Sequence, residues 1–436
     1  MTFDLIIKNA TLPDGRTHMD VAVAGGEIAA IEPAITAEAG RVVEADGCLL
    51  APPFVDVHFH LDATLSVGQP RFNHSGTLLE GIQLWGEQRP LRTVDAVVER
   101  AMRYCDLAVA QGLLAIRTHV DVCDEGLVGV EALLHVRDMV KDRIDLQLVA
   151  FPQDGYFRAP TAAANLVRAL DMGVDIVGGI PHFERTMADG QRSVVELCTL
   201  AAARGLKVDI HCDETDDPHS RHVETLAAET IRLGLRGQVA ASHLTSMHSM
   251  DNYYASKLIP LIAEAGLHCI ANPLANLNLQ GRSDSYPKRR GLMRIPELRA
   301  QGVNVALAQD SCMDPWYVLG NADMLDVAHM ATHAAHMIGL NDIRYTFDAV
   351  TTHAADAFGL ERYGLKPGCH ADFVLLDAPS PIDAVRLRAD RLLVVRRGRI
   401  LAETPARRTR LYLDNRPETV SIAKFAPIWP GPNERQ

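Results

Sequence analysis

The chain has 436 residues, 47% of them hydrophobic, and a formal net charge of -12 at pH 7. This length can bury a large core, and it suggests two or three domains or one barrel with an accessory domain. Nucleic acids and anionic membrane surfaces attract clustered Lys and Arg, so the acidic balance argues against both as partners and favours a small neutral substrate.

Eight cysteines are scattered along the sequence without a C-x-x-C pair, which is typical of a protein from a reducing compartment. The N-terminus lacks the basic and apolar regions of a signal peptide, and no run approaches the roughly 20 apolar residues of a membrane span. We therefore expect a cytoplasmic protein.

The two ends of the chain share a pattern of short predicted β-strands. Residues 1–51 read as short strands separated by turns, and residues 361–415 repeat this pattern around Pro-Gly and Arg-Gly turns. We expect both segments to form one small β-sandwich that flanks an inserted main body. The Pro-rich tail, residues 416–436, is expected to be either disordered or an extended arm on a neighbouring subunit.

Residues 52–360 alternate apolar strands with amphipathic helices, the pattern of βα units around a parallel sheet. Helices are expected at 93–112, with Thr93 as N-cap and Gly112 as stop, and at 192–205, ending at Gly205. Eight strands would close a (β/α)8 barrel of the α/β class. The candidate strands are 53–60, 113–122, 144–153, 174–183, 206–214, 238–245, 267–276 and 303–311.

Polar residues stand at the ends of these strands, where such barrels carry their sites. His58 and His60 lie two positions apart, so their side chains are expected on one face of the first strand. A single buried histidine is more often a structural core residue, but this pair is joined at later strand ends by His211, His243 and Asp310. Imidazoles with a carboxylate suit Zn2+ or Fe2+ and leave a position for water.

These residues and their surroundings resemble the amidohydrolase superfamily and, within it, the bacterial cytosine deaminases. The resemblance covers nearly the whole chain. It rests on the motifs "PPFVDVHFHLDATLSVGQPRFNHSGTLLEGI", "RTHVDV", "VAFPQDG", "GIPHFERT", "HCDETDD", "SHLTSMHS", "NPLANLNLQGRSDSYPKRRG" and "DPWYVLGNADM". It implies one divalent ion, Zn2+ or Fe2+, held by His58, His60, His211 and Asp310, because strand four lacks the lysine of binuclear members.

The resemblance also implies catalytic roles. Metal-bound hydroxide would attack the ring carbon that bears the amine, with Asp310 as general base and then general acid. His243 would orient the attacking water, and Glu214 would protonate the adjacent ring nitrogen. The alternative for Glu214 is one of several acids on a solvated loop. His119 and His182 are expected to support the site or the structure.

Three further residues are expected to bind the substrate. Gln153 offers an amide that can donate to a carbonyl oxygen and accept from a ring N–H. Trp316 could pack on the ring, or simply form part of a lid. Ser311 follows Asp310 where the cytosine deaminases usually carry a second acid, so we expect a pocket that tolerates a 5-substituent such as the methyl of 5-methylcytosine.

The sequence therefore predicts a metal-dependent deaminase of a free amino-pyrimidine that releases ammonia. One alternative keeps the site but changes the substrate to an amino-triazine, an isoguanine-like purine or a creatinine-like cyclic amidine. Another is a non-catalytic assembly protein with this fold, which we disfavour because every expected ligand is present. A homo-oligomer is expected by analogy with the cytosine deaminases.

Overall fold

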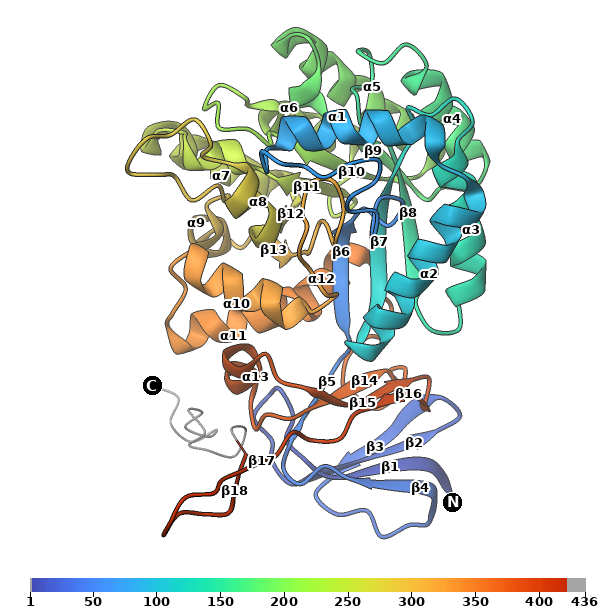
Figure 1. Cartoon of the computed structure of the whole chain (residues 1–436), viewed down its shortest axis with the longest axis vertical. Helices are drawn as coiled ribbons and strands as arrows, with labels where there is room; N and C mark the ends of the chain where they lie inside the picture. The colour runs from blue at the N-terminus through green and yellow to red at the C-terminus, as the bar shows by residue number, and fades with distance from the viewer. Residues whose placement is uncertain (1, 422–436) are drawn as a thin grey trace.

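The computed structural model describes residues 2–421 (Figure 1). Its centre is a sheet of eight parallel strands whose neighbours in space follow chain order. The strands are β6 (Phe54–Phe59), β7 (Leu113–Asp121), β8 (Asp145–Phe151), β9 (Ile176–Gly179), β10 (Lys207–Cys212), β11 (Val239–His243), β12 (His268–Ala271) and β13 (Asn304–Leu307).

The first and last of these strands meet at a seam. The Asp310 backbone N–H donates to the His58 carbonyl oxygen at 2.9 Å, and the His60 N–H donates to the Asp310 carbonyl oxygen at 3.1 Å. These bonds nearly close the sheet into the barrel that the sequence predicts, and all eight expected strands are confirmed.

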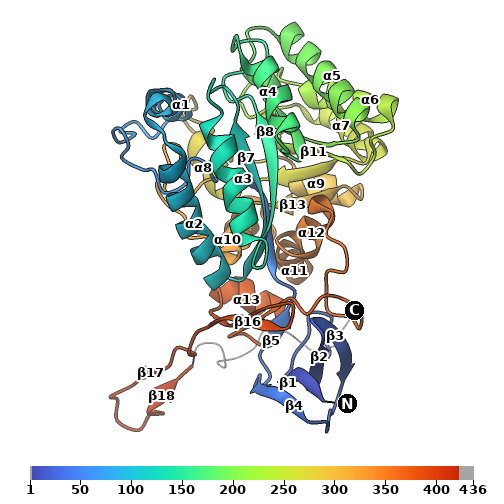
Figure 2. The ribbon, with the colours of Figure 1, turned by 90° about the vertical axis from the view of Figure 1, so that its right-hand side faces the viewer.

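Helices surround the sheet (Figures 1 and 2). The longer ones are α1 (Leu78–Gln88), α2 (Val94–Ala110), α3 (Val128–Val140), α4 (Ala162–Asp171), α5 (Met187–Arg204), α6 (His222–Leu233), α7 (Asn252–Ala265), α10 (Met324–Ala334) and α11 (Leu340–Ala349). The shorter ones are α8 (Pro273–Leu279), α9 (Ile295–Ala300), α12 (Thr352–Phe358) and α13 (Pro381–Leu387), with 3-10 turns at Arg89–Leu91, Pro181–Phe183 and Thr245–His248.

Two helix ends illustrate how local sequence sets these boundaries. The Thr93 hydroxyl accepts from the Ala96 N–H at the start of α2, as expected of its N-cap. Helix α5 ends at Gly205 as predicted but begins at Met187, five residues before the expected start. Thr186 is the reason, because its hydroxyl accepts from the Asp189 N–H and caps the helix earlier.

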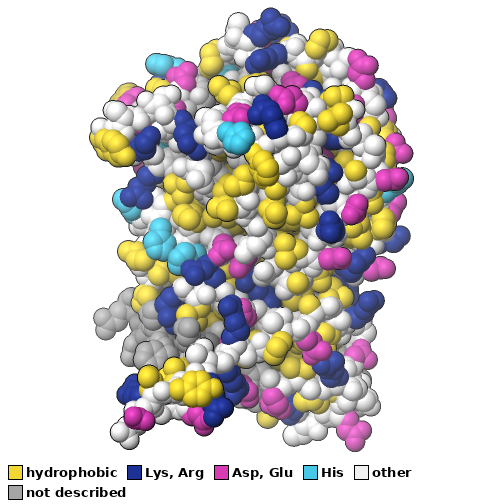
Figure 3. All heavy atoms as spheres, in the orientation of Figure 1, with side chains coloured by type: hydrophobic (Ala, Val, Ile, Leu, Met, Phe, Trp, Pro, Cys, Tyr) yellow, Lys and Arg dark blue, Asp and Glu magenta, His cyan; other side chains and the backbone are white. Residues whose placement is uncertain are grey.

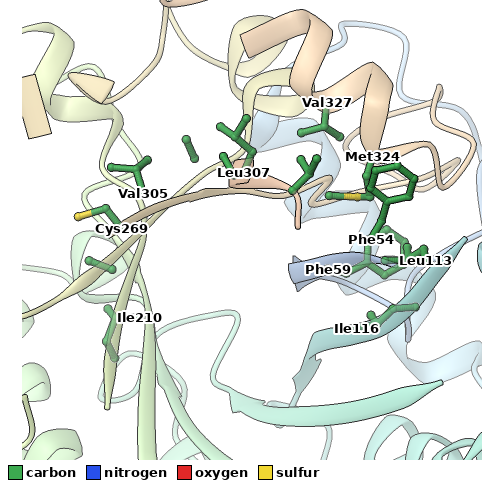
Figure 4. Packing of buried hydrophobic residues seen from close by; sticks show 14 of the residues in the cluster. Phe54, Phe59, Leu113, Ile116, Ile210, Cys269, Val305, Leu307, Met324 and Val327 are labelled. Atoms are coloured by element: carbon green, nitrogen blue, oxygen red, sulfur yellow. The ribbon is translucent and has the colours of Figure 1, made fainter. Parts of the chain in front are cut away.

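Large apolar side chains fill the space between sheet and helices. Figure 4 shows Phe54 and Phe59 of β6 beside Met324 of α10, with Leu113 and Ile116 of β7 close by. All five are fully or almost fully buried. Burial of each such side chain is worth about 1.5–3 kcal/mol, so this layer fixes β6 firmly against its neighbours.

Strand β6 is not regular. Its pairing register with β7 shifts between Asp56 and Phe59. Val57 and His58 both lie within the shifted stretch. Val55 and Val57 belong to a buried cluster with small residues of neighbouring strands and of α12, whereas His58 joins the site described below. A bulge of this kind re-aims the side chains that follow it, so strict alternation alone does not place the histidines.

Two four-stranded sheets lie at the lower end of the barrel (Figure 2). They contain β1 (Phe3–Ala10), β2 (Met19–Ala24), β3 (Glu27–Glu32), β4 (Ala39–Glu44) and β5 (Leu49–Ala51) from the N-terminal end, and β14 (Phe373–Leu376), β15 (Arg391–Arg396) and β16 (Arg399–Glu403) from the C-terminal end. One buried hydrophobic cluster draws on both sheets, for example Ile7 and Phe373. The expected sandwich is thus built from both ends of the chain.

The predicted tail, 416–436, lies largely outside the described residues. Its described part contains β18 (Thr419–Val420), which pairs with β17 (Thr409–Arg410). On the face seen in Figure 3, acidic and basic side chains are interspersed. Among residues 2–421, no helix combines the length and apolar character that crossing a membrane requires.

Candidate metal centre and active site

Histidines and one aspartate converge at the C-terminal ends of the barrel strands. His60 Nε2 lies 3.1 Å from His211 Nε2. Asp310 Oδ1 lies 3.3 Å from His58 Nε2 and 3.4 Å from His60 Nε2. His58, His211, Asp310 and His243 each offer an atom within 4.8 Å of the others. The structure therefore brings together all four residues expected to hold an ion, with His243 beside them.

The donor chemistry of this cluster fits a divalent cation. Neither ring nitrogen of His58 has a hydrogen-bond partner within residues 2–421, although the residue is fully buried. Burial and the neighbouring histidines lower the pKa of His211 well below its usual value, so its imidazole is neutral. Burial opposes ionisation of Asp310, but the adjacent histidines hold its pKa well below the ordinary range. Neutral imidazoles and an ionised carboxylate are the forms that bind Zn2+ or Fe2+.

A second buried group stands beside the cluster. Glu214 Oε1 lies 3.5 Å from His243 Nδ1 and accepts a hydrogen bond from Asn276 Nδ2 at 3.0 Å. Asn272 Nδ2 lies 3.1 Å from His243 Nδ1. Burial, followed by the negative charge of Asp310, raises the pKa of Glu214 well above its ordinary value. A carboxyl group that keeps its proton at neutral pH can act as an acid.

Two site residues have unusual backbone conformations. His243 and Asp310, each at the end of a barrel strand, both have φ of 72°. This left-handed region is uncommon for residues other than glycine and costs about 1–3 kcal/mol when the surrounding structure imposes it. The hydrogen bonds of Asp310 to the His58 and His60 backbone hold one of these conformations in place. Such strain clusters at functional sites.

The cluster opens into a cavity of about 540 Å³. Its deep part contains the metal-ligand candidates and Glu214, and its outer part is formed by α1 and the segment after α8. The lining residues are His60, Thr77, Leu78, Leu79, Ile82, Gln153, Ile180, His182, Phe183, His211, Glu214, Thr215, Asp216, His243, Leu279, Gln280, Arg282, Ser283, Asp310, Ser311 and Trp316. This volume accommodates a small-molecule substrate.

The three residues expected to bind substrate all line this cavity. Gln153 and Ser311 are buried, with 6% and 2% of their surface exposed. The Trp316 ring centroid lies 5.8 Å from that of His60. Asp314 fixes the turn that carries Trp316, because its Oδ1 accepts from the backbone N–H groups of Trp316 and Tyr317 at 2.9 Å.

Helix α1 covers the mouth, a feature that the sequence did not reveal. Trp85 Nε1 donates to Asp121 Oδ2 at 2.8 Å and so ties the helix to the end of β7. From the other side, Arg282 Nη2 donates to the Gly76 carbonyl oxygen at 2.6 Å. Thr77 and Ile82 thereby reach the cavity. The sequence around residues 75–82 belongs to one of the motifs that resemble the cytosine deaminases, but its amphipathic pattern does not predict where the helix lies.

Gly81 lets this helix approach Trp316. A Cβ atom added at Gly81 would lie 2.5 Å from Trp316 Cδ1. We therefore expect Gly81→Ala to displace Trp316 or α1 and to lower kcat/KM about tenfold to a hundredfold, in line with the cost of misplacing a positioned group. Steady-state rates test this, with Gly86→Ala on the same helix as control, because a Cβ there meets no atom within 4 Å. Equal rates for the two variants would contradict a positioning role for Trp316.

His119 lies close to the cluster, and His182 lines the cavity beside it. The His119 ring centroid is 4.2 Å from that of His58, and its Nε2 is 3.6 Å from Asp209 Oδ1. Asp209 Oδ2 in turn accepts from Arg117 Nη1 at 2.9 Å. The sequence does not predict this buried chain, because Asp209 lies about ninety residues from Arg117 and His119 and looks like an ordinary strand residue.

Comparisons with known proteins agree with this architecture. The model of a family described as "Amidohydrolase family" matches residues 41–402. A crystal structure of 5-methylcytosine deaminase from Klebsiella pneumoniae, with 5-fluorocytosine bound, superposes with a TM-score of 0.91 at 42% identity and covers 93% of this chain and 99% of that one.

Two relatives by sequence have related activities. Pterin deaminase from Rhizobium rhizogenes is 31% identical over 416 residues, which is 91% of this chain and 93% of the relative. N-isopropylammelide isopropyl amidohydrolase from Pseudomonas sp. strain ADP is 29% identical over 413 residues, which is 92% of this chain and 98% of the relative. Both act on amino-substituted heterocycles by name.

Proposed function

The chain belongs to the amidohydrolase family, and from this premise we propose that it is a metal-dependent deaminase of a free amino-pyrimidine base, with 5-methylcytosine as a preferred substrate. One observation carries the proposal: a buried cluster of metal-binding histidines and Asp310 shares its cavity with a carboxyl group, Glu214, whose pKa is raised. The chain is a hydrolytic enzyme, so the non-catalytic alternative is set aside.

His58, His60, His211 and Asp310 would hold one divalent ion, Zn2+ or Fe2+. When bound, such an ion lowers the pKa of water from 15.7 toward about 7 and supplies hydroxide at neutral pH. His119 lies against His58 and would help to fix the orientation of that ligand.

Three side chains would move or orient protons. Asp310 accepts the proton of the attacking water and passes it to the departing nitrogen, which leaves as ammonia. His243, held by Asn272 and lying beside Glu214, orients that water. Glu214 donates its proton to the ring nitrogen next to the attacked carbon, so that the electron pair displaced from the C=N bond is taken up as an N–H bond. The second proton of the attacking water is released when the C–N bond breaks and the carbonyl forms, and it returns to Glu214.

The substrate ring would lie between Gln153 and Trp316. The Gln153 amide can donate to the ring carbonyl and accept from a ring N–H, as recognition of a pyrimidine requires. Trp316 offers a flat apolar surface. Ser311, small and uncharged, leaves room beside the ring for a methyl group, which agrees with the 5-methylcytosine activity named for the Klebsiella relative.

A second candidate keeps the same chemistry but takes another amino-heterocycle. The names of two relatives favour it, because one acts on a pterin and the other on N-isopropylammelide. The whole cavity, at about 540 Å³, is also larger than a single pyrimidine ring needs. An assay of ammonia release separates the candidates, with 5-methylcytosine, cytosine, isoguanine, a pterin and an amino-triazine as substrates. The amino-pyrimidine proposal fails if 5-methylcytosine and cytosine are both inert while another compound reacts.

Ser311→Asp should shift the preference among pyrimidines. A carboxylate at this position occupies more space beside the ring, so kcat/KM for 5-methylcytosine relative to cytosine should fall about tenfold or more, the effect expected of one methylene-sized group. The matched control is Ser283→Asp, which places the same change at the exposed rim of the cavity. A substrate ratio that is unchanged in Ser311→Asp would refute the role of Ser311.

A further inference from the structure

A second cavity lies at the opposite end of the barrel from the metal cluster. It has a volume of about 450 Å³ and is bordered by the first residues of β6, β7 and β8, and by the sheet that contains β14 and β15. Figure 1 shows this sheet directly below the lower strand ends. The N-terminal face of a barrel normally serves stability, so a cavity of this size there calls for an explanation.

The side chains around this second cavity are mostly basic. Five basic side chains line it against three acidic ones, in a protein whose net charge is -12. The basic residues are Arg137, Lys141, Arg362, Arg396 and Arg397. The lining therefore carries more basic than acidic side chains, although Arg137 and Arg362 form ion pairs with Asp175 and Glu27, which lie outside it.

Arg396 is the most deeply placed of these cations, with 5% of its surface exposed. Its Nη1 donates to Asp372 at 2.9 Å and its Nη2 donates to Asp145 at 2.7 Å. Its Nε is buried and has no hydrogen-bond partner within residues 2–421. Two of the three acids are thus already engaged, while one buried donor is left without an acceptor, at a cost of about 1–3 kcal/mol.

Arg397 and Lys141 are less fully neutralised than Arg396. Arg397 Nη1 lies 2.7 Å and 2.9 Å from the two ring nitrogens of His370, and its Nε lies 3.6 Å from Asp372 Oδ2, a carboxylate oxygen that Arg396 also contacts. Partial burial, then Arg397 and Arg362, lower the pKa of His370. Lys141 is exposed at the end of α3 and has no ion pair within residues 2–421. These groups offer hydrogen-bond donors and positive charge at one rim of the cavity.

Apolar side chains complete the lining. They are Phe358 at the end of α12, Leu360 and Tyr363 in the segment that follows it, and Ile144 and Leu146 at the start of β8. The Tyr363 hydroxyl donates to the Pro53 carbonyl oxygen at 2.6 Å, which leaves its ring as part of the wall. A basic rim beside an apolar wall is complementary to a molecule with an anionic group on an apolar body.

We propose that this second cavity binds a small organic anion, a phosphate or carboxylate on an aromatic or aliphatic body, through Arg397, Lys141 and Arg396. The site is separate from the proposed deaminase site, which takes a neutral base at the other end of the barrel. Because barrel strands and the small sheet both border it, a bound anion stabilises their junction and raises the unfolding temperature as its concentration increases.

Phenyl phosphate is a suitable probe, with phenol as its uncharged counterpart and inorganic phosphate as the anion without the ring. For the metal-loaded protein, we expect phenyl phosphate to raise the unfolding temperature in a saturable manner, phosphate to do so at higher concentration, and phenol to have no effect. Calorimetric titration gives the dissociation constant. An equal response to phenol and phenyl phosphate would overturn the proposal.

Arg397→Gln locates the binding. Loss of one charge-assisted contact should weaken phenyl phosphate binding about tenfold or more. Arg399→Gln is the matched control, because Arg399 is exposed on the same hairpin and lies outside the cavity. The unfolding temperatures of both variants without ligand show whether they fold. If Arg397→Gln binds phenyl phosphate as tightly as Arg399→Gln does, binding occurs elsewhere, for example at the metal cluster, and the proposal is overturned.

Discussion

Glu214→Gln is expected to lower kcat about 10²- to 10⁴-fold, the range for loss of a positioned general acid. The amide has nearly the same shape and keeps an oxygen that can accept from Asn276 Nδ2, so the fold and KM should change little. It cannot, however, give a proton to the ring nitrogen. Ammonia release with the best base from the substrate screen measures the effect.

The matched control is Asp217→Asn, an exposed acid on the same loop whose side chain accepts from the His219 backbone N–H. Its rate should equal that of the wild type. The pH profile supplies a second test. Since the pKa of Glu214 is raised, its active protonated form persists to higher pH than that of an ordinary carboxyl group and is lost as pH rises through the raised pKa, so kcat should fall on the alkaline side. A loss below tenfold, or an alkaline decline that survives in Glu214→Gln, would remove Glu214 from the mechanism.

His211→Ala is expected to abolish both metal binding and activity. His211 Nε2 lies 3.1 Å from His60 Nε2, so the substitution removes one imidazole from the centre of the cluster. Elemental analysis should show about one zinc or iron ion per wild-type chain, as for a mononuclear site, and almost none in the variant. Reloading the metal-free wild type with Zn2+ or Fe2+ should restore ammonia release. The ion that restores the higher rate indicates the native metal.

His219→Ala is the control for this experiment, because His219 is an exposed histidine of the loop that follows β10. It should retain both metal and activity. Circular dichroism of His211→Ala, compared with that of metal-free wild type, separates loss of a ligand from loss of the fold. A folded His211→Ala protein that still binds one ion and turns over substrate would contradict the proposed ligand set.

Much of this architecture could be predicted, because each βα unit carries its own signals. Apolar runs of strand length, capping residues such as Thr93 and stops such as Gly205 are local, and the barrel follows from their number. The convergence of His211 and Asp310 also follows, since the C-terminal ends of parallel strands meet at one face.

Features that depend on contacts between distant segments cannot be predicted from the sequence in this way. In a strand with strict alternation, the neighbouring side chains of Val57 and His58 cannot both point into the barrel. The register shift of β6 allows it, and this shift has no sequence signature in a run such as "FVDVHFH". The strained backbone of His243 is imposed by its surroundings rather than by its residue type. The covering of the mouth by α1 and the basic cavity at the far end both arise from contacts between distant segments.

The seam between β6 and β13 has a consequence for biosynthesis. His58 and His60 are made early and Asp310 is made some 250 residues later, yet they share backbone hydrogen bonds. A nascent chain that still lacks β13 therefore has an incomplete coordination set, and ion capture has to wait until the circle of strands is joined. Uptake of the ion thus reports that the barrel has closed, and the free energy of metal binding adds to the two hydrogen bonds that join its first and last strands.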